Sequence, residues 1–293
     1  MKLIDSTKRY FKGNTHAHTT RSDGSRAPEA VLETYRAAGY DFLAVTDHWR
    51  SFPAQMYGDM RVLCGEEFDF DFDDQALHIV GVFPDEGAAQ GLSRGMDHRA
   101  LISAINASGG AAIAAHPAWS LNTPEFLRGL EGVCAAEVYN TFSGEPWNAP
   151  RADSTGVLDL VAAAGRCIPQ LAADDSHMYE GEQCRSFTML QADSLRPEDI
   201  LSALRRGSFY ASQGPRFLDV ELNGRELVVR TSPVCRVNFI SNKVWSDGRC
   251  RSGAGMTEQA YRIRPGERFI RCEIMDEAGR RAWLSPVLLD GGN

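Results

Sequence analysis

The sequence predicts an α/β fold followed by a smaller all-β domain, and two patterns carry that prediction. Up to about residue 213, short apolar runs alternate with segments of helical period, which is typical of repeated βα units. After Gln213-Gly214-Pro215, strand-like runs follow one another and no long helix is indicated. We therefore expect a barrel or a doubly wound sheet in residues 1–215 and a small β-sandwich in residues 216–293.

Each predicted βα unit ends its helix at a glycine and continues into a short apolar strand. In the first unit a helix begins near Pro28 and ends at Gly39, and residues 41–45 then form a buried strand. The later helices and the strands that follow them are expected at 101–105 and 111–115, at 155–164 and 168–173, and at 197–206 and 208–211. After residue 215, we expect a hairpin at 220–229 that turns at Asn223-Gly224, and strands at 237–240, 260–263, 269–275 and 282–289.

Composition and charge argue against several kinds of partner and location. The formal net charge of −8 disfavours a long nucleic acid, because binding a phosphate backbone needs a basic surface. No apolar run approaches the roughly 20 residues of a membrane span, and residues 1–12 lack the apolar core of a secretory signal. The seven cysteines are scattered and form no CxxC pair, as expected for reduced thiols in a cytoplasmic protein. A small anionic substrate is compatible with this charge if metal ions supply the positive charge.

Six of the seven histidines fall at or beside predicted strands, and this placement indicates a metal site. His16 and His18 stand two residues apart, so in a strand both imidazoles point to one side. Further histidines and carboxylates follow other strands or lie in strand-like runs, at Asp23, His48, Glu67, His78, His116, Asp175 and His177. In a (β/α) barrel the carboxyl ends of the strands converge on one face, where active sites are built. Imidazole and carboxylate ligands together suit manganese, iron or zinc.

Each motif has a plainer interpretation when it is taken alone. A single His-x-His in a strand is more often a surface pair or a hydrogen-bonded core pair than a pair of ligands. Asp175 could cap a helix, Glu67 could be a solvated loop residue, and His98 is expected to be a solvated helix residue. Glu137, a charge within an apolar run, is either a support behind the site or a structural acid that a partner satisfies. The joint placement of the six histidines favours the metal site.

The ordered motifs resemble those of the PHP (polymerase and histidinol phosphatase) superfamily. They are His16-Ala17-His18, Ser22-Asp23-Gly24, Thr46-Asp47-His48, Gly65-Glu66-Glu67, His78, His116-Pro117 and Asp175-Ser176-His177. The segment Gly207–Pro215, followed by a β-rich tail, is similar to the carbaryl-hydrolase-type (CehA/McbA-like) branch of these metallohydrolases. The chain departs from the phosphatase members at Ala118-Trp119, where an arginine commonly follows the His-Pro motif.

This resemblance implies a distorted (β/α)7 TIM-like barrel that holds two or three divalent metal ions, which are manganese, iron or zinc. The ligands that it implies are His16, His18, Asp23, His48, Glu67, His78, His116, Asp175 and His177. Glu67, not Glu66, occupies the position that bridges two metals, and Asp23 occupies a position that is histidine in some members.

The leading hypothesis is a metal-dependent phosphoesterase that hydrolyses a small phosphate ester, a nucleotide or a sugar phosphate, through a metal-bridging hydroxide. The expected partner is therefore a phosphorylated small molecule. The residues expected to act in catalysis are His48, Asp175 and His177, and those expected to contact the substrate are Arg21, Trp119 and Asn140. Two alternatives stay open: a carbamate, ester or amide hydrolase with the same metal centre, and a non-catalytic metal-binding accessory module.

Overall fold

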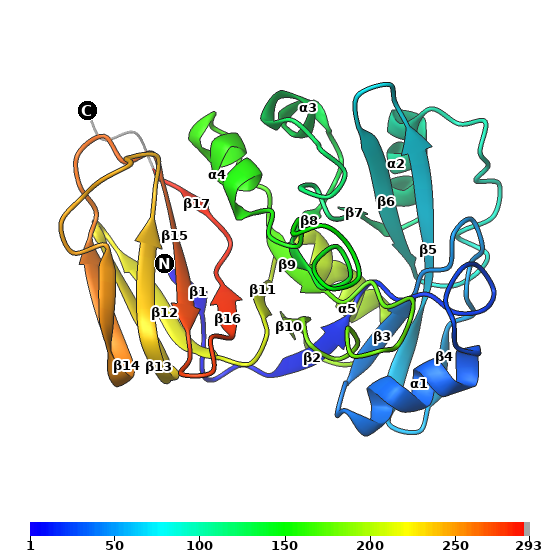
Figure 1. Ribbon diagram of the computed structural model, residues 1–293, viewed down its shortest axis with the longest axis horizontal. Coiled ribbons are helices and arrows are strands. Elements are labelled where there is room, and N and C mark those ends of the chain that lie inside the picture. The colour runs from blue at the N-terminus through cyan, green and yellow to red at the C-terminus, as the bar shows by residue number, and fades with distance from the viewer. Residues whose placement is uncertain (290–293) are drawn as a thin grey trace.

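The computed structural model describes residues 1–289, which form an α/β part and a β-rich part that lie side by side (Figure 1). The helices are α1 (Pro28–Ala37), α2 (His98–Ala107), α3 (Pro124–Gly129), α4 (Thr155–Ala163) and α5 (Pro197–Arg205). The strands of the α/β part are β2 (Tyr10–Asn14), β3 (Phe42–Val45), β4 (Gln55–Tyr57), β5 (Met60–Asp71), β6 (Ala76–Phe83), β7 (Ala111–Ala114), β8 (Ala135–Asn140), β9 (Gln170–Ala173), β10 (Phe187–Gln191) and β11 (Phe209–Ser212). The β-rich part contains β1 (Lys2–Ile4), β12 (Phe217–Asn223), β13 (Glu226–Ile240), β14 (Cys250–Arg262), β15 (Phe269–Met275), β16 (Arg281–Trp283) and β17 (Val287–Leu288).

The sheet of the α/β part is mixed rather than built of βα repeats throughout. Strands β2, β3 and β5 are parallel neighbours, and so are β7, β8 and β9. Between these two sets, β6 runs antiparallel to both β5 and β7, and β10 runs antiparallel to β2. Only residues 72–75 separate β5 from β6, and so short a connection makes a hairpin because a parallel crossover needs a dozen residues or more. The repeated βα pattern expected from the sequence is therefore interrupted at residues 60–83.

Strands β9 and β10, at the two ends of this sheet, are linked by the hydrogen bonds of one side chain. In β10, the Thr188 hydroxyl donates to the carbonyl oxygen of Ala172 in β9 at 3.0 Å and accepts from the Ala172 amide at 3.3 Å. No backbone ladder joins β9 to β10 within residues 1–289. The predicted mixed α/β architecture is confirmed, and a closed (β/α)7 barrel stays a prediction.

Helix α5 and one apolar cluster fill one end of the sheet and so leave the other end for the site. The cluster contains Phe42 and Ala111, which begin the parallel strands β3 and β7, and Val82 near the end of the antiparallel strand β6. The buried face of α5, with Ile200 and Leu204, packs into the same cluster. Because the apolar residues gather where the parallel strands begin, polar side chains are left at the opposite end, where those strands finish.

The helices expected from the sequence begin and end within a few residues of the observed ones. Helices α4 and α5 occupy Thr155–Ala163 and Pro197–Arg205, and β15 coincides with the strand expected at 269–275. Helix α3 was not expected, although Thr123 caps it by accepting a hydrogen bond from the Phe126 amide at 3.2 Å. The helices described within residues 1–289 are all too short or too polar to cross a membrane.

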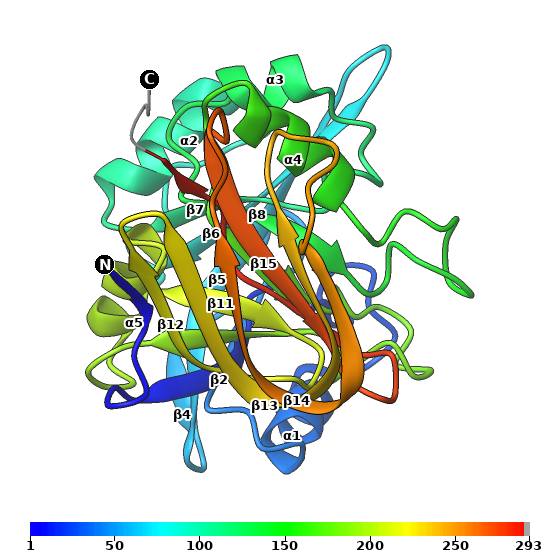
Figure 2. The same cartoon turned by 90° about the vertical axis from the view of Figure 1, so that its left-hand side faces the viewer.

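The β-rich part is organised around one long strand, β13, which runs beside β14 (Figure 2). The sequence pattern predicted separate strands at 220–229 and 237–240, but the chain stays extended between them. The register of β13 shifts around Pro233, which has no amide hydrogen to donate to a ladder. β13 therefore pairs with β12 through its first half and with β15 through its second half.

One strand pairing and one buried ion pair connect the two parts. β1 pairs with β12, so the N-terminal strand joins the β-rich part, and β11 pairs with β16. The buried Arg271 of β15 makes two hydrogen bonds to Asp159 of α4, at 2.6 and 2.7 Å. The domain boundary at 215/216 stays a prediction, and residues 290–293 of the second domain lie outside the described residues.

Candidate metal centre

All nine predicted ligands meet where the parallel strands end. His16 and His18 follow β2, His48 follows β3, His116 follows β7, and Asp175 and His177 follow β9. Glu67 and His78 lie within the hairpin strands β5 and β6, and Asp23 lies in the loop before α1. The ligand atoms form three groups, in each of which they lie within 4.8 Å of one another. These groups are His18, Asp23, His48 and His177; His16, His18, Glu67 and Asp175; and Glu67, His78 and His116.

The inner group is fully buried and joins two imidazoles to two carboxylates. Oε2 of Glu67 lies 3.1 Å from His16 Nε2 and 3.0 Å from His18 Nε2. Asp175 Oδ1 lies 3.0 and 3.1 Å from the same two nitrogens. Because all four atoms face a common point, this group can surround a single cation.

Glu67 connects the inner group with a second one. Its other oxygen, Oε1, lies 2.9 Å from Nδ1 of His78 and 3.4 Å from Nε2 of His116. The two oxygens of one carboxylate therefore face different groups, which is the arrangement that the resemblance implied for Glu67.

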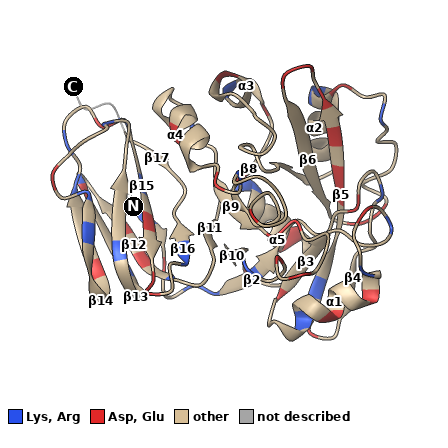
Figure 3. Cartoon of the chain, in the orientation of Figure 1, with Lys and Arg blue, Asp and Glu red and all other residues tan. Residues whose placement is uncertain are grey.

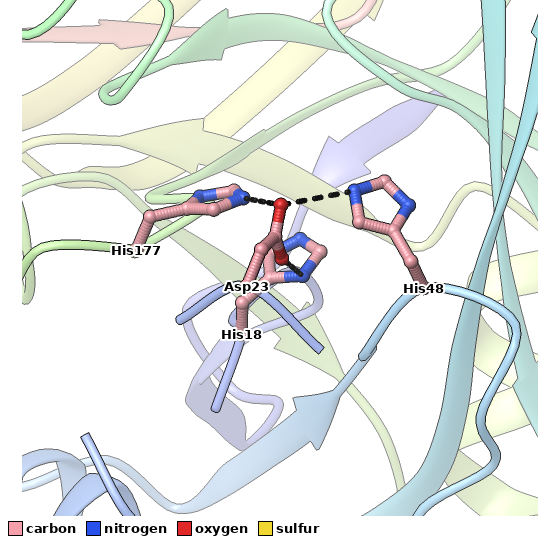
Figure 4. Close-up of side chains that lie close together, drawn as sticks. All are labelled: His18, Asp23, His48 and His177. Atoms are coloured by element: carbon pink, nitrogen blue, oxygen red, sulfur yellow. Dashed lines mark ion pairs between the residues drawn. The ribbon is translucent and has the colours of Figure 1, made fainter. Parts of the chain in front are cut away.

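The outer group reaches the surface through Asp23, whose side chain is 54% exposed. Asp23 Oδ2 lies between His177 Nε2, at 3.4 Å, and His48 Nε2, at 3.7 Å (Figure 4). The rings of His18 and His177 stack with their centroids 4.0 Å apart. His18 belongs to both this group and the inner one, so the three groups adjoin one another.

Several buried atoms of the inner group lack hydrogen-bond partners, and this tests whether metal ions fit. Within residues 1–289, Nε2 of His16 and Nε2 of His18 lie 3.0 and 3.1 Å from Oδ1 of Asp175, but these three atoms make no well-aligned hydrogen bond. Leaving such atoms buried and unpaired is costly, so native proteins rarely do so without a ligand. Imidazole and carboxylate atoms that point at a common centre suit divalent cations of the first transition series. The side chains therefore fit several metal ions, whose identity the side chains do not determine.

The charges of the surrounding side chains also favour a cation at this site. Burial opposes protonation of His16 and His18, but Asp175 and Glu67 outweigh it and raise the pKa of both imidazoles well above the usual value. The same proximity lowers the pKa of Glu67 well below its ordinary value, although burial alone would raise it. The buried carboxylates therefore favour positive charge at this point.

Glu137 lies behind the site and holds two of the candidate ligands, which is the first of the two roles that the sequence allowed for it. Its Oε1 lies 2.8 Å from Nδ1 of His16, and its Oε2 accepts from the His116 amide at 2.9 Å. Asn140 donates to the same Oε2 at 2.7 Å. By accepting a hydrogen bond from Nδ1–H of His16, the Glu137 carboxylate leaves the lone pair of Nε2 free to bind a metal.

Asn140, a predicted substrate contact, lies behind the candidate ligands and does not line the cavity beside them. Its side chain is fully buried and donates to Glu137 and, at 3.2 Å, to Asp175 Oδ2. Its carbonyl oxygen accepts from the Ser143 amide at 3.0 Å. Since these three bonds occupy the amide group, the structure favours a role for Asn140 in positioning Asp175, and its contact with a substrate stays a prediction.

The other two predicted substrate contacts lie on different sides of the ligand groups. Trp119 lines a cavity of about 390 Å³ together with His48, His116 and His177. Arg21 lines a neighbouring groove beside Asp23, with its guanidinium 5.3 Å from the centre of the Phe52 ring. Both therefore stay candidates for substrate contact.

Two aspartates that the sequence analysis did not assign hold the loops that carry ligands. Asp47 Oδ1 accepts from the Thr19 amide at 2.8 Å and from the Ser22 hydroxyl at 2.7 Å, which holds the loop of Asp23. Asp174 accepts from three consecutive backbone amides, including that of Ser186 at 2.7 Å. Burial raises the pKa of Asp174 to about 7. Their only signal in the sequence was a position next to His48 and Asp175.

The backbone at two ligands has an unusual conformation. His116 and Asp175 have φ values of 29° and 55°, in the left-handed region that residues other than glycine seldom adopt. Such conformations concentrate at functional sites, where surrounding contacts maintain them. Close by, a Cβ at Gly24 would lie 2.6 Å from the carbonyl carbon of His18, so the loop can approach the ligand only with glycine there.

Comparison with solved structures assigns the class of fold. A two-domain protein from Bacteroides vulgatus, described as containing a predicted PHP-like metal-dependent phosphoesterase, superposes with a TM-score of 0.56. The alignment covers 96% of each chain at 14% identity. The chain therefore shares the fold of this two-domain PHP-like protein, in agreement with the predicted resemblance at the level of the fold.

Two other solved structures align with part of the chain. A protein from Bifidobacterium adolescentis, provisionally described as a metal-dependent phosphoesterase, has a TM-score of 0.39 at 16% identity over 56% of this chain and 87% of its own. An amidohydrolase from Chromobacterium violaceum with bound sulfate has a TM-score of 0.41 at 16% identity over 58% of this chain and 89% of its own. No family model and no curated protein matches the sequence.

Proposed function

We propose that this protein is a metal-dependent hydrolase that cleaves a small phosphate ester, such as a nucleotide or a sugar phosphate. One observation carries the proposal: nine histidines and carboxylates from distant parts of the chain form three adjoining groups beside an open cavity. A structural site would be closed, whereas a catalytic site keeps its ligands accessible to a substrate. The full-length match with a two-domain PHP-like protein supports the proposal at the level of the fold.

The three groups would hold two or three divalent ions, for which manganese, iron and zinc are the candidates. Bound there, such ions would lower the pKa of water and neutralise the charge that develops on phosphoryl oxygens. The chain's own residues orient the ligands, since Glu137 directs His16 and Asn140 directs Asp175. His48 and His177 are the candidates to transfer a proton to the leaving group, because both line the cavity.

A second candidate is a carbamate, ester or amide hydrolase that uses the same ligands. One observation favours it: none of the described residues that line the cavity is a lysine or an arginine. The arginine that commonly follows His-Pro in the phosphatases is replaced here by Ala118-Trp119, and Trp119 faces the cavity. A neutral carbonyl substrate needs no such cation, whereas a phosphate would depend on the metals for charge neutralisation.

A substrate panel with defined metal content tests the proposal. The protein, purified without a histidine tag, is first analysed for metals, and at least two divalent ions per chain are expected. p-Nitrophenyl phosphate, a phosphodiester and a carboxyl ester are then compared in the presence of manganese, with His16→Ala as the inactive control. Turnover of the phosphates supports the first candidate. Turnover of the carboxyl ester alone would replace it with the second.

We also propose a small-molecule partner and a cytoplasmic location. Lysine and arginine residues are interspersed with acidic ones along the ribbon of both parts of the molecule (Figure 3), which supports a small partner rather than a long nucleic acid. All seven cysteines are free, in agreement with a reducing compartment.

A further inference from the structure

Three aromatic side chains line the cavity beside the ligands and are not needed for metal binding or for proton transfer. They are Trp119, Phe142 and Trp147, here called the aromatic wall. Trp119 follows the His-Pro motif after β7, and the other two lie in the loop between β8 and α4.

Two of the rings pack directly against predicted ligands. The Phe142 ring stacks on His177 with a centroid distance of 4.4 Å and an interplanar angle of 15°. The Trp119 ring meets His116 edge-on at 4.9 Å, and its indole nitrogen donates to Asn148 Oδ1 at 3.3 Å. These contacts hold both rings in place, so a ligand that enters the cavity meets a preformed surface.

The third ring is held from outside the cavity. Trp147 also lines a neighbouring cavity, and there the guanidinium of Arg185 lies over its ring, 5.3 Å from the centre. Arg185 does not line the cavity beside the ligands, so Trp147 separates that cavity from the cation. Its loop is held by hydrogen bonds from the amides of Trp147 and Asn148 to the carbonyl oxygen of Gly144, at 3.1 and 2.8 Å.

The charge of the cavity separates it into two regions. All of its described acidic lining residues, Asp23, Glu67 and Asp175, belong to the ligand groups. The aromatic wall, with Met178, offers flat apolar surface, and no described lysine or arginine adjoins it within the cavity. A charged group placed there would lose hydration without gaining a partner, whereas a planar apolar group would gain stacking contacts.

We propose that the aromatic wall binds a planar, uncharged ring of the substrate, so that the ester cleaved at the ligand groups is a phosphate monoester of a ring-bearing alcohol. The inference rests on the proposed phosphatase function. In the reaction, the oxygen of water bonds to phosphorus, the P–O ester bond breaks, and the ring-bearing alcohol leaves with a proton. The cavity volume of about 390 Å³ accommodates a ring of one or two fused cycles beside the phosphoryl group.

Two phosphate esters that differ only in the ring test this inference. Benzyl phosphate and cyclohexylmethyl phosphate have alcohols of similar acidity and equal carbon number, but only benzyl phosphate carries a planar ring. With metal-loaded protein, we expect kcat/KM to favour benzyl phosphate by roughly tenfold, which corresponds to the upper range for a pair of stacked rings. Calorimetric binding of benzylphosphonate, which cannot be hydrolysed in this way, gives a readout that does not depend on turnover.

Substitutions of Trp147 test whether the aromatic wall causes this preference. The rings of Phe142 and Trp119 pack against predicted ligands, whereas the Trp147 ring does not, so its removal takes away no ring contact with a ligand. Trp147→Ala should abolish the preference and weaken benzylphosphonate binding, and Trp147→Phe should retain both. The matched control is Trp245→Ala, which removes a tryptophan that is 75% exposed in the β-rich part and should change neither.

The outcomes separate this inference from the proposed function. Equal turnover of both esters, or a benzyl preference that survives Trp147→Ala, would overturn the inference and leave the phosphatase proposal standing. Turnover of neither ester, with no binding of benzylphosphonate, would overturn both.

Discussion

Replacing Glu137 by glutamine keeps the shape of the side chain and removes one of its two acceptor oxygens. In the native protein one oxygen faces His16 Nδ1, and the other accepts from both the His116 amide and Asn140. A glutamine must keep its single oxygen toward the two donors, because its NH2 group would oppose them. The NH2 group then faces His16 Nδ1 and makes that nitrogen an acceptor. The neutral imidazole is thereby protonated at Nε2, the atom that faces the inner group.

This change of tautomer should weaken metal binding without unfolding the protein. Loss of a carboxylate that orients a metal-binding histidine costs about 10- to 100-fold in metal affinity or activity, which corresponds to roughly 1.4 to 2.7 kcal/mol. We expect Glu137→Gln to fall within this range. The full loss of the site is not expected, because Glu67 and Asp175 still face the same position.

Competition between the protein and a chelator of known affinity measures this effect, and circular dichroism checks that the variant is folded. The matched control is Glu267→Gln, the same substitution at a buried glutamate of the β-rich part, which accepts from Arg249 and Tyr261. The control should alter stability and leave metal affinity unchanged. Native metal affinity in a folded Glu137→Gln variant would refute the argument from the tautomer.

Three further predictions concern the ligands, a loop and the contact between the two parts. His16→Ala and Asp175→Ala should each lose metal and activity while remaining folded. Elemental analysis measures the metal, the substrate panel measures the activity, and circular dichroism checks the fold. Retained activity in a metal-free variant would contradict the metal centre. Gly24→Ala should displace the Asp23 loop, since its Cβ would lie 2.6 Å from the His18 carbonyl carbon, and should reduce metal stoichiometry; unchanged metal content would contradict this. Arg271→Ala leaves Asp159 without its buried partner and should lower the free energy of unfolding by about 3 kcal/mol in denaturant titration. The exposed pair Arg36–Glu33 of α1 supplies the control, because a solvated ion pair contributes little and Arg36→Ala should lower the free energy of unfolding far less; equal costs for the two variants would contradict the role of Arg271.

Much of the secondary structure could be predicted because it depends on neighbouring residues. Helix α4 was expected at 155–164 and occupies Thr155–Ala163, and strand β15 was expected and found at 269–275. The period of apolar residues and the terminating glycines carry that information locally. The hairpin of β5 and β6 was missed because its turn, residues 72–75, contains neither glycine nor proline. The continuous path of β13 through Pro233 was missed for the opposite reason, since a proline there suggests a break.

The sequence allowed the convergence of the candidate ligands to be predicted, whereas their role in metal binding stays a prediction and their surroundings were predicted less well. The spacing of His16 and His18, and the positions of His48, His116 and Asp175 after strands, follow from local pattern. The sequence could not distinguish Asn140, which lies behind the ligands, from Trp119, which faces the cavity. Both lie close to an apolar run of the sequence, and only the packing around them determines which side chain is accessible.

By itself the sequence determined the chemistry of the ligands and the order in which the chain presents them, because residue type and short-range period are local properties. The tertiary structure decided which atoms meet. The contact between His16 and Glu137 joins residues 121 positions apart, and that between Tyr179 and the backbone of His18 joins residues 161 apart. Contacts at such separations depend on how the strands are ordered and how their ends are connected, which no local pattern specifies.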